Sequence, residues 1–325
     1  MRKNVSAIAI AFSLFVMLTS NSLSAADYHV KLIKKFYSMA TASINGTYYP
    51  VGNSIARLIS KKTKDLVVVA EPTAGSLANI EYLKSGNVDL ALIQSDVAWM
   101  AFNGSHNFSE NKFRELRILA SLYSEVIQIV VRADSEIKTI QDLKGRKISV
   151  GEHDSGSAAS VKLVLEAAGL LPEDYVLVFE RFTRATESLG DGYVDAVCYA
   201  GGVPADGITR LAAKVPVRLI PVSGDVATKL VSKYPFFSQE TIAANLYKGQ
   251  DSALATIGLR ALLVGTEGLS SEEVLLMLGI IYDNPAVYEQ GQVKIEMLLA
   301  DGLKGIDNAM LHEGSRKFFR LNGQK

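Results

Sequence analysis

The chain has 325 residues, of which 48% are hydrophobic and 21% are charged. That balance is typical of a globular protein with one large core or two ordinary ones, and it excludes global disorder. Basic and acidic residues are equal in number, at 34 each, so there is no charge excess of the kind that favours nucleic acid or an anionic membrane.

The first 26 residues differ from the rest of the chain. Arg2 and Lys3 precede an apolar stretch over residues 7–18, and the small residues Ser-Ala-Ala follow at 24–26. This pattern predicts a secretory signal peptide over residues 1–26, and hence a periplasmic protein after cleavage. An uncleaved membrane anchor is the alternative, but the apolar stretch is shorter than the about 20 residues that a spanning helix needs.

The chain contains one cysteine, Cys198. A single cysteine excludes an intrachain disulfide, and an exported chain almost without cysteine suits a bacterial periplasm better than a disulfide-rich secreted domain. Cys198 lies within the apolar segment YVDAVCYA, so we expect it to be a small buried hydrophobic residue.

The segment SINGTYYPVGNSIARLIS at 43–60 predicts a loop that leads into a helix. Apolar residues recur at helical spacing over 51–59, and Pro50 is tolerated in a first helical turn. A helix N-terminus carries unpaired N–H groups and about half a positive charge, so it favours an anion. The alternative is a simple helix cap, in which Thr47 or Asn45 satisfies the first amides.

The same loop contains two adjacent tyrosines. Tyr48 and Tyr49 each offer a flat apolar face and a hydroxyl group to a small ligand, which favours a binding site over a plain cap. The candidate ligand-binding residues of this loop are Ser43, Asn45, Thr47, Tyr48 and Tyr49.

Strands then alternate with helices through short loops. We expect strands over residues 66–70, 88–94, 146–151, 176–180 and 193–200. Helices are expected over residues 77–84 and 158–169. This alternation argues for a parallel sheet within an α/β fold.

An internal similarity indicates two related halves. LKSGNVDLA at 83–91 matches LGDGYVDAV at 189–197 in the pattern Leu-x-x-Gly-x-Val-Asp. In each copy we expect a helix to end, glycine to turn the chain and Val-Asp to open a buried strand. Two similar α/β lobes are the interpretation.

The boundaries of these lobes follow from where the chain crosses between them. Residues 117–128 are the candidate first crossover, and a strand over 253–265 and a helix over 270–282 follow later. Two crossings assign residues 27–122 together with 236–325 to lobe 1, and residues 123–235 to lobe 2.

Small, polar and glycine-rich loops follow the expected strands. In open α/β sheets, ligands bind beyond the carboxyl ends of the strands, so two lobes facing each other would form a cleft there. Further candidate ligand-binding residues from these loops are Gly75, Ser76, Gln94, Ser95, Ser155, Gly156, Ser157, Arg184, Gly201 and Gly202. Taken singly, each serine-rich loop is better explained as a helix cap than as a binding site, and Asp96 is interpreted as the N-cap of the helix that follows it.

Signatures of catalysis are missing from the sequence. The four histidines show no metal-ligand spacing with one another or with the cysteine, and the chain has no G-x-S-x-G, P-loop or G-x-G-x-x-G motif. His153-Asp154-Ser155 contains the residue types of a triad, but successive side chains diverge. We therefore expect no cofactor, no metal and no enzyme activity.

Four phrases resemble a known family. GTYYPVG at 46–52, GNVDLALIQSDVAWMAFNG at 86–104, LKGRKISVGEHDSGS at 143–157 and YPFFSQETIAANLYKGQD at 234–251 are similar to the TAXI family, the solute-binding proteins of tripartite ATP-independent periplasmic (TRAP) transporters.

The resemblance implies a two-lobed periplasmic-binding-protein fold, type II-like, with the ligand cleft between the lobes. It also implies a small organic acid as solute, glutamate-like or another carboxylate, and a TRAP membrane transport subunit as partner of a monomeric protein. Thr47, Tyr48, Tyr49, Gln94, Ser95 and Ser155 to Ser157 match the family's loops. Two loops depart from it, because Ser43-Ile44-Asn45 is poorer in glycine and the His153-Asp154 pair is unusual.

Two other functions stay open. A solute receptor for a membrane sensor would have the same fold, and a gene neighbour that encodes a multi-span transporter would argue against it. A secreted enzyme on this fold would return candidate solutes chemically changed.

Overall fold

The computed structural model describes residues 34–284, 289–290, 293–294, 302–303 and 306–324. Residues Lys34–Lys325 form one compact unit. The predicted signal peptide lies outside the described residues. In the part of the chain that is described, every helix is too short or too polar to cross a membrane.

The first third of this unit alternates strands and helices. Its elements are β1 (Lys35–Ala40), α1 (Tyr48–Lys62), β2 (Leu66–Glu71), α2 (Ser76–Lys84), β3 (Leu90–Gln94) and α3 (Ser95–Asn103), followed by the short 3-10 helix η1 (His106–Phe108). The strands expected at 66–70 and 88–94 and the helix expected at 77–84 are confirmed. β1 was not predicted, because its six residues carry only a short apolar pattern.

The middle of the chain repeats this alternation. Its elements are β4 (Leu116–Arg132), η2 (Ile140–Leu143), β5 (Lys147–Ser149), α4 (Gly156–Ala167), η3 (Pro172–Asp174), β6 (Val176–Val178), α5 (Phe182–Gly190) and β7 (Ala196–Gly201). The three expected strands and the expected helix of this region are confirmed, with β5 and β6 shorter than expected. Cys198 is buried in β7, as predicted.

The remaining elements complete the fold. They are α6 (Asp206–Lys214), β8 (Val217–Ile220), α7 (Gly224–Lys233), β9 (Ser238–Ile242), β10 (Leu254–Thr266), α8 (Ser271–Tyr282), the paired β11 (Glu289–Gln290) and β12 (Val293–Lys294), η6 (Asn308–Met310) and α9 (Glu313–Leu321). The strand predicted at 253–265 and the helix predicted at 270–282 are confirmed as β10 and α8.

One mixed sheet joins these strands, in the order β2-β1-β3-β10-β4-β7-β5-β6, with β8 beside β4 and β9 beside β10. The predicted parallel pairing is confirmed within β2-β1-β3 and within β7-β5-β6. No pairing was predicted for β4 and β10, which run antiparallel to each other. β4 is also antiparallel to β7, and β10 is antiparallel to β3. Both strands are long and apolar, so their direction is not evident from the sequence pattern.

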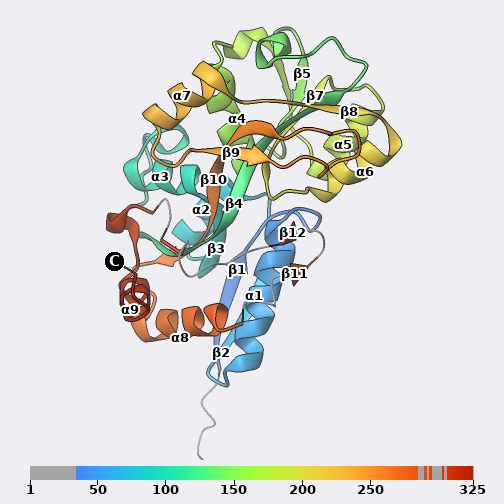
Figure 1. Cartoon of the computed structure of the whole chain (residues 1–325). Helices are drawn as coiled ribbons and strands as arrows, with labels where there is room; N and C mark the ends of the chain where they lie inside the picture. Colours follow the sequence, from blue (N-terminus) through green and yellow to red (C-terminus); the bar gives the residue numbers. More distant parts are fainter. Residues whose placement is uncertain (1–33, 285–288, 291–292, 295–301, 304–305, 325) are drawn as a thin grey trace, which may run out of the picture. The chain divides into compact units, whose positions relative to one another are not determined.

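The strands β4 and β10 lie side by side through the middle of the sheet (Figure 1). They separate one parallel group, β1 to β3, from the other, β5 to β7. The predicted lobe boundary after residue 122 falls inside β4, and the boundary before residue 236 falls just ahead of β9. The division into lobes at those residues stays a prediction.

Helices cover both faces of the sheet. In β3, Leu90 and Leu92 pack in one cluster with α1, α8 and α9, whereas Ala91 and Ile93 pack in another with α2, α3, α4 and α7. Successive strand residues point to opposite faces, so a strand covered on both sides is apolar throughout. This explains why β3 reads as the unbroken run LALI. A third cluster joins α5 and α6 to β7.

Candidate ligand-binding site

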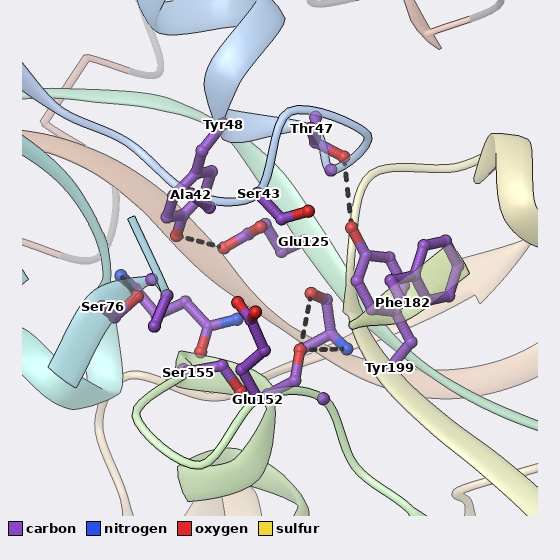
Figure 2. Close-up of a pocket in the computed structure, with 18 residues that line it drawn as sticks. Ala42, Ser43, Thr47, Tyr48, Ser76, Glu125, Glu152, Ser155, Phe182 and Tyr199 are labelled. Atoms are coloured by element: carbon purple, nitrogen blue, oxygen red, sulfur yellow. Dashed lines mark hydrogen bonds between the residues drawn. The ribbon is translucent and has the colours of Figure 1, made fainter. Parts of the chain in front are cut away.

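A cavity of about 70 Å³ lies where the carboxyl ends of β1, β2, β3, β5 and β7 meet (Figure 2). Its lining residues are Ala42, Ser43, Gly46, Thr47, Tyr48, Ala74, Gly75, Ser76, Gln94, Glu125, Gly151, Glu152, Ser155, Gly156, Ser157, Phe182, Tyr199 and Ala200. Residues from both parallel strand groups therefore contribute to one cavity. This is the edge of the sheet at which α/β proteins bind their ligands.

Three helix N-termini meet at this cavity. The helices α1, α2 and α4 begin at Tyr48, Ser76 and Gly156, and all three residues line it. The first amides of a helix have no partner within the helix, and they place partial positive charge at its start. The cavity is therefore favourable for an anionic group.

The N-termini of α2 and α4 are held together by direct contacts. The amides of Leu77 and Ala78 in α2 donate to the carbonyl oxygen of Asp154, at 3.1 and 3.2 Å. Ser155 is the N-cap of α4, and its side chain accepts a hydrogen bond from the amide of Ala158. The capping interpretation of Ser155 is thus correct, and the same residue also lines the cavity.

A buried pair, Tyr48 and Glu125, occupies one wall. The Tyr48 hydroxyl donates to Glu125 Oε2 at 2.8 Å, and the two residues are 5% and 2% exposed. Burial raises the pKa of Glu125 to about 8, although the Tyr48 hydrogen bond opposes this. The Glu125 carboxyl group is therefore mainly protonated at pH 7.

A second buried network lies next to it. Ser160 Oγ donates to Asp96 Oδ2 at 2.6 Å and lies 3.1 Å from Gln94 Oε1. The prediction that Asp96 caps the following helix is wrong, because Gln94 is the N-cap of α3 and Asp96 is fully buried. Burial raises the pKa of Asp96 to about 6. This network joins α3 to α4, and so links the two strand groups beside the cavity.

An aromatic wall closes the cavity on the β7 side. The rings of Phe182 and Tyr199 stack with their centroids 3.9 Å apart. The Tyr199 hydroxyl lies 3.4 Å from Thr47 Oγ1, so the loop before α1 meets β7 directly (Figure 2). Ser157 Oγ accepts from the Ala200 amide at 3.1 Å, which fixes the start of α4 against the end of β7. The arrangement provides a flat apolar surface beside several hydroxyl groups.

The structure places the predicted site residues in two groups. Those that line the cavity are Ser43, Thr47, Tyr48, Gly75, Ser76, Gln94, Ser155, Gly156 and Ser157. Those that do not are Asn45, Tyr49, Ser95, Arg184, Gly201 and Gly202.

Local geometry explains two residues of the second group. Ser95 follows Gln94 at the start of α3, and its hydroxyl accepts from the amide of Arg260 on β10. Arg184 lies in α5 rather than in the predicted loop, and it pairs with Glu187 of the same helix at 3.5 Å. Its position on α5 points the Arg184 side chain into solvent, where it is 56% exposed.

Four lining residues with functional side chains were not predicted. They are Glu125, Glu152, Phe182 and Tyr199. Glu125 is the only charged residue between Arg117 and Arg132 in the long strand β4, which is the signal that marks it. Phe182 and Tyr199 carry no comparable signal, because aromatic residues at element ends are common.

The lining carries acidic but no basic side chains among the described residues. Glu152 and Glu125 are its two acids, and Arg181 Nε contacts Glu152 Oε1 at 3.0 Å. In the described part of the chain, no group of three or more His, Cys, Asp or Glu could hold a metal ion. The site therefore offers hydroxyl groups, amides, one protonated carboxyl group and an aromatic face, which are means of binding.

Comparison with solved structures gives the fold. A protein from Bordetella bronchiseptica RB50 is 14% identical, with 90% of this chain and 99% of that chain covered and a TM-score of 0.53. A structure from work on glutathione import via GshT and the cystine ABC importer TcyBC of Streptococcus mutans is 12% identical, with 79% and 92% covered and a TM-score of 0.51. The periplasmic aliphatic sulphonate binding protein SsuA from Escherichia coli is 16% identical, with 90% and 84% covered and a TM-score of 0.48.

The chain has the mixed α/β fold of the two-lobed periplasmic binding proteins, as predicted. At such low identity the similarity to solved structures shows the fold alone. The family is shown by the sequence, because the model of one protein family matches residues 39–323, which are most of the chain. The protein belongs to the NMT1-like family.

Proposed function

We propose that this protein is a periplasmic solute-binding protein that captures a small organic acid in the cavity at the starts of α1, α2 and α4. The observation that carries the proposal is the convergence of these three helix N-termini on a cavity lined by hydroxyl groups. The glutamate-like or other carboxylate solute comes from the resemblance to the TAXI family.

Energetics supports binding of a carboxylate without a paired arginine. One helix N-terminus contributes ~0.3 to 1 kcal/mol to an exposed charge and up to ~2 kcal/mol in a partly buried site. Hydrogen bonds to a charged group contribute ~1.5 to 3 kcal/mol each. Ser43, Thr47 and the start of α4 line the cavity, so we expect their hydroxyl groups and first amides to supply several such bonds.

Delivery to a TRAP membrane subunit belongs to the same proposal and rests on the sequence resemblance. The cystine ABC importer named for one structural neighbour makes an ABC transporter the second candidate partner. The two partners are distinguished by measuring solute uptake in cells that express the protein together with the membrane transporter encoded by a neighbouring gene. A TRAP partner predicts uptake that follows an ion gradient, and an ABC partner predicts uptake that requires ATP.

A thermal-shift screen of organic and amino acids tests the binding function. A solute at 100 times its dissociation constant adds ~2.7 kcal/mol to the free energy of unfolding, which raises the melting temperature by several degrees. We expect at least one carboxylate to do so, and NMR should then recover that solute chemically unchanged. If no acid shifts the melting temperature, or if the solute is converted, the proposed function is wrong.

A matched pair of variants locates the binding. Thr47→Val keeps the side-chain volume but removes the hydroxyl that faces Tyr199 and the cavity. It should weaken binding of the solute by roughly tenfold, the effect of ~1.4 kcal/mol. Arg184→Ala removes a charged side chain of α5 that lies outside the cavity and should leave binding unchanged.

A further inference from the structure

Glu125 lies in an unusual position for an acidic residue. It belongs to the central strand β4, lines the cavity and is 2% exposed. Its Oε2 atom accepts the Tyr48 hydroxyl at 2.8 Å (Figure 2). Glu125 therefore contributes a carboxyl group to the wall of the cavity.

Titratable and charged side chains from several helices and strands surround Glu125. The titratable and charged groups that act on it are Tyr48 of α1, Asp96 of α3, Tyr123 of β4, Tyr199 of β7 and Arg260 of β10. Arg260 is the cation of this set, and it does not line the cavity. Its guanidinium group donates to Ser121 and Ser124, at 2.7 and 2.9 Å, on the strand next to its own.

An anionic solute in this cavity therefore meets a carboxyl group and no lining cation among the described residues. An ionised Glu125 would repel the anion. A protonated Glu125 has an O–H group that can donate, and a hydrogen bond from O–H to a carboxylate is among the shorter and stronger kinds. Glu125 therefore opposes binding of an anion when it is ionised and assists it when it is protonated.

We propose that Glu125, in its protonated form, recognises the anionic group of the solute by donating a hydrogen bond from its carboxyl O–H to a solute oxygen. This inference rests on the proposed function and assigns the residue that makes the site select an anion. Burial supports it, because it raises the pKa of Glu125 to about 8 and keeps the proton in place at pH 7. At higher pH the free protein loses that proton, so binding of the solute must restore it.

Calorimetric titration measures this proton directly. Succinate, pyruvate and L-glutamate are each titrated at pH 6, in phosphate and in MES, and at pH 8.5, in borate and in Tris, because the two buffers at each pH have different ionisation heats. For the acid that binds most tightly we expect uptake of about three quarters of a proton at pH 8.5 and about none at pH 6, from a pKa near 8. Above pH 8 the affinity for that acid should fall with rising pH, and the loss should approach tenfold per pH unit.

Two variants separate this role from a structural one. Glu125→Gln keeps a hydrogen-bond donor of the same size, so we expect binding with no proton uptake at either pH. Tyr48→Phe removes the hydroxyl that favours the ionised carboxylate, so the onset of proton uptake should move to higher pH. The wild-type comparison of the two pH values still tests the inference if a variant fails to fold.

Each outcome has a defined meaning. Proton uptake in the wild type that is absent in Glu125→Gln supports the inference. Binding without proton exchange, or with proton release as expected for a cationic solute group, overturns it. An acid that binds without proton exchange leaves the proposed function intact, whereas no binding by any of the three acids counts against the proposed function as well.

Discussion

Replacing Glu125 by glutamine should change how the stability of the protein depends on pH. The Glu125 carboxyl group is buried, and burial raises its pKa to about 8, from 4.5 for an unperturbed glutamate. Between these two values the folded protein binds more protons than the unfolded chain, so the free energy of unfolding falls as pH rises. The contribution is complete below pH 4.5 and is lost as pH rises through about 8.

The size of the effect follows from the two pKa values. Each pH unit in this interval costs about 1.4 kcal/mol, so the whole shift corresponds to roughly 5 kcal/mol. Glutamine has the same shape and no proton to lose, and it can still accept the Tyr48 hydroxyl. Glu125→Gln should therefore be more stable than the wild type at pH 8 by several kcal/mol, with a much smaller difference at pH 5.

Urea unfolding at pH 5, 6, 7 and 8, followed by circular dichroism, measures this slope. Asp96 is the matched control, because burial raises its pKa to about 6. Its contribution to stability is therefore lost as pH rises through about 6, below the pH at which that of Glu125 is lost. Between pH 5 and 6 both carboxyl groups contribute to the slope, so Asp96→Asn should reduce the slope there and leave it unchanged between pH 6 and 8. If Glu125→Gln loses stability between pH 6 and 8 in parallel with the wild type, the assignment of the buried proton to Glu125 is wrong.

The contacts that join α4 to the β1–β3 side of the sheet give two further predictions. Ser160→Ala removes the hydroxyl that donates to Asp96 at 2.6 Å, and a buried carboxylate that loses a donor costs ~1.5 to 3 kcal/mol. Urea unfolding at pH 8 should show this loss, and an unchanged midpoint would argue against the network. In Gly156→Ala, the added methyl group would lie 2.0 Å from Gln94 Oε1 and 2.7 Å from Ser76 Oγ, so these cavity-lining side chains or α4 must shift. Calorimetry should show binding of the solute weakened at least tenfold. Gly279→Ala in α8 meets open space, so it should gain up to ~1 kcal/mol of stability and bind as the wild type does. Equal binding by both glycine variants would exclude a role for this contact.

Much of the fold could be predicted because local pattern and final environment agree. The strand β3 is covered on both faces, so its unbroken apolar run marks it clearly, and α8 is marked by an apolar run of helical length after two acidic residues. The direction of β4 and β10 could not be predicted. Strand direction depends on which distant segments pair, and two long apolar strands carry no local sign of it.

The candidate site was partly predictable for a related reason. Loops after strands can be recognised by their small and polar residues, so Ser43, Gly75 and Ser157 were identified. Which side of such a loop faces the cavity depends on the backbone, which turns Ser95 towards Arg260 instead. Glu125 was missed because it lies within a strand, where burial and its partner Tyr48, rather than a motif, give it a role.

A crystal structure of the protein grown with the tightest-binding organic acid tests the central claim most directly. We predict that the solute lies in the cavity at the starts of α1, α2 and α4, with its carboxylate within hydrogen-bond distance of Glu125 and of the first turn of α4. A solute bound in another cavity, such as the one of about 310 Å³ beside Trp99 and Met310, with the first cavity free of it, would contradict the account.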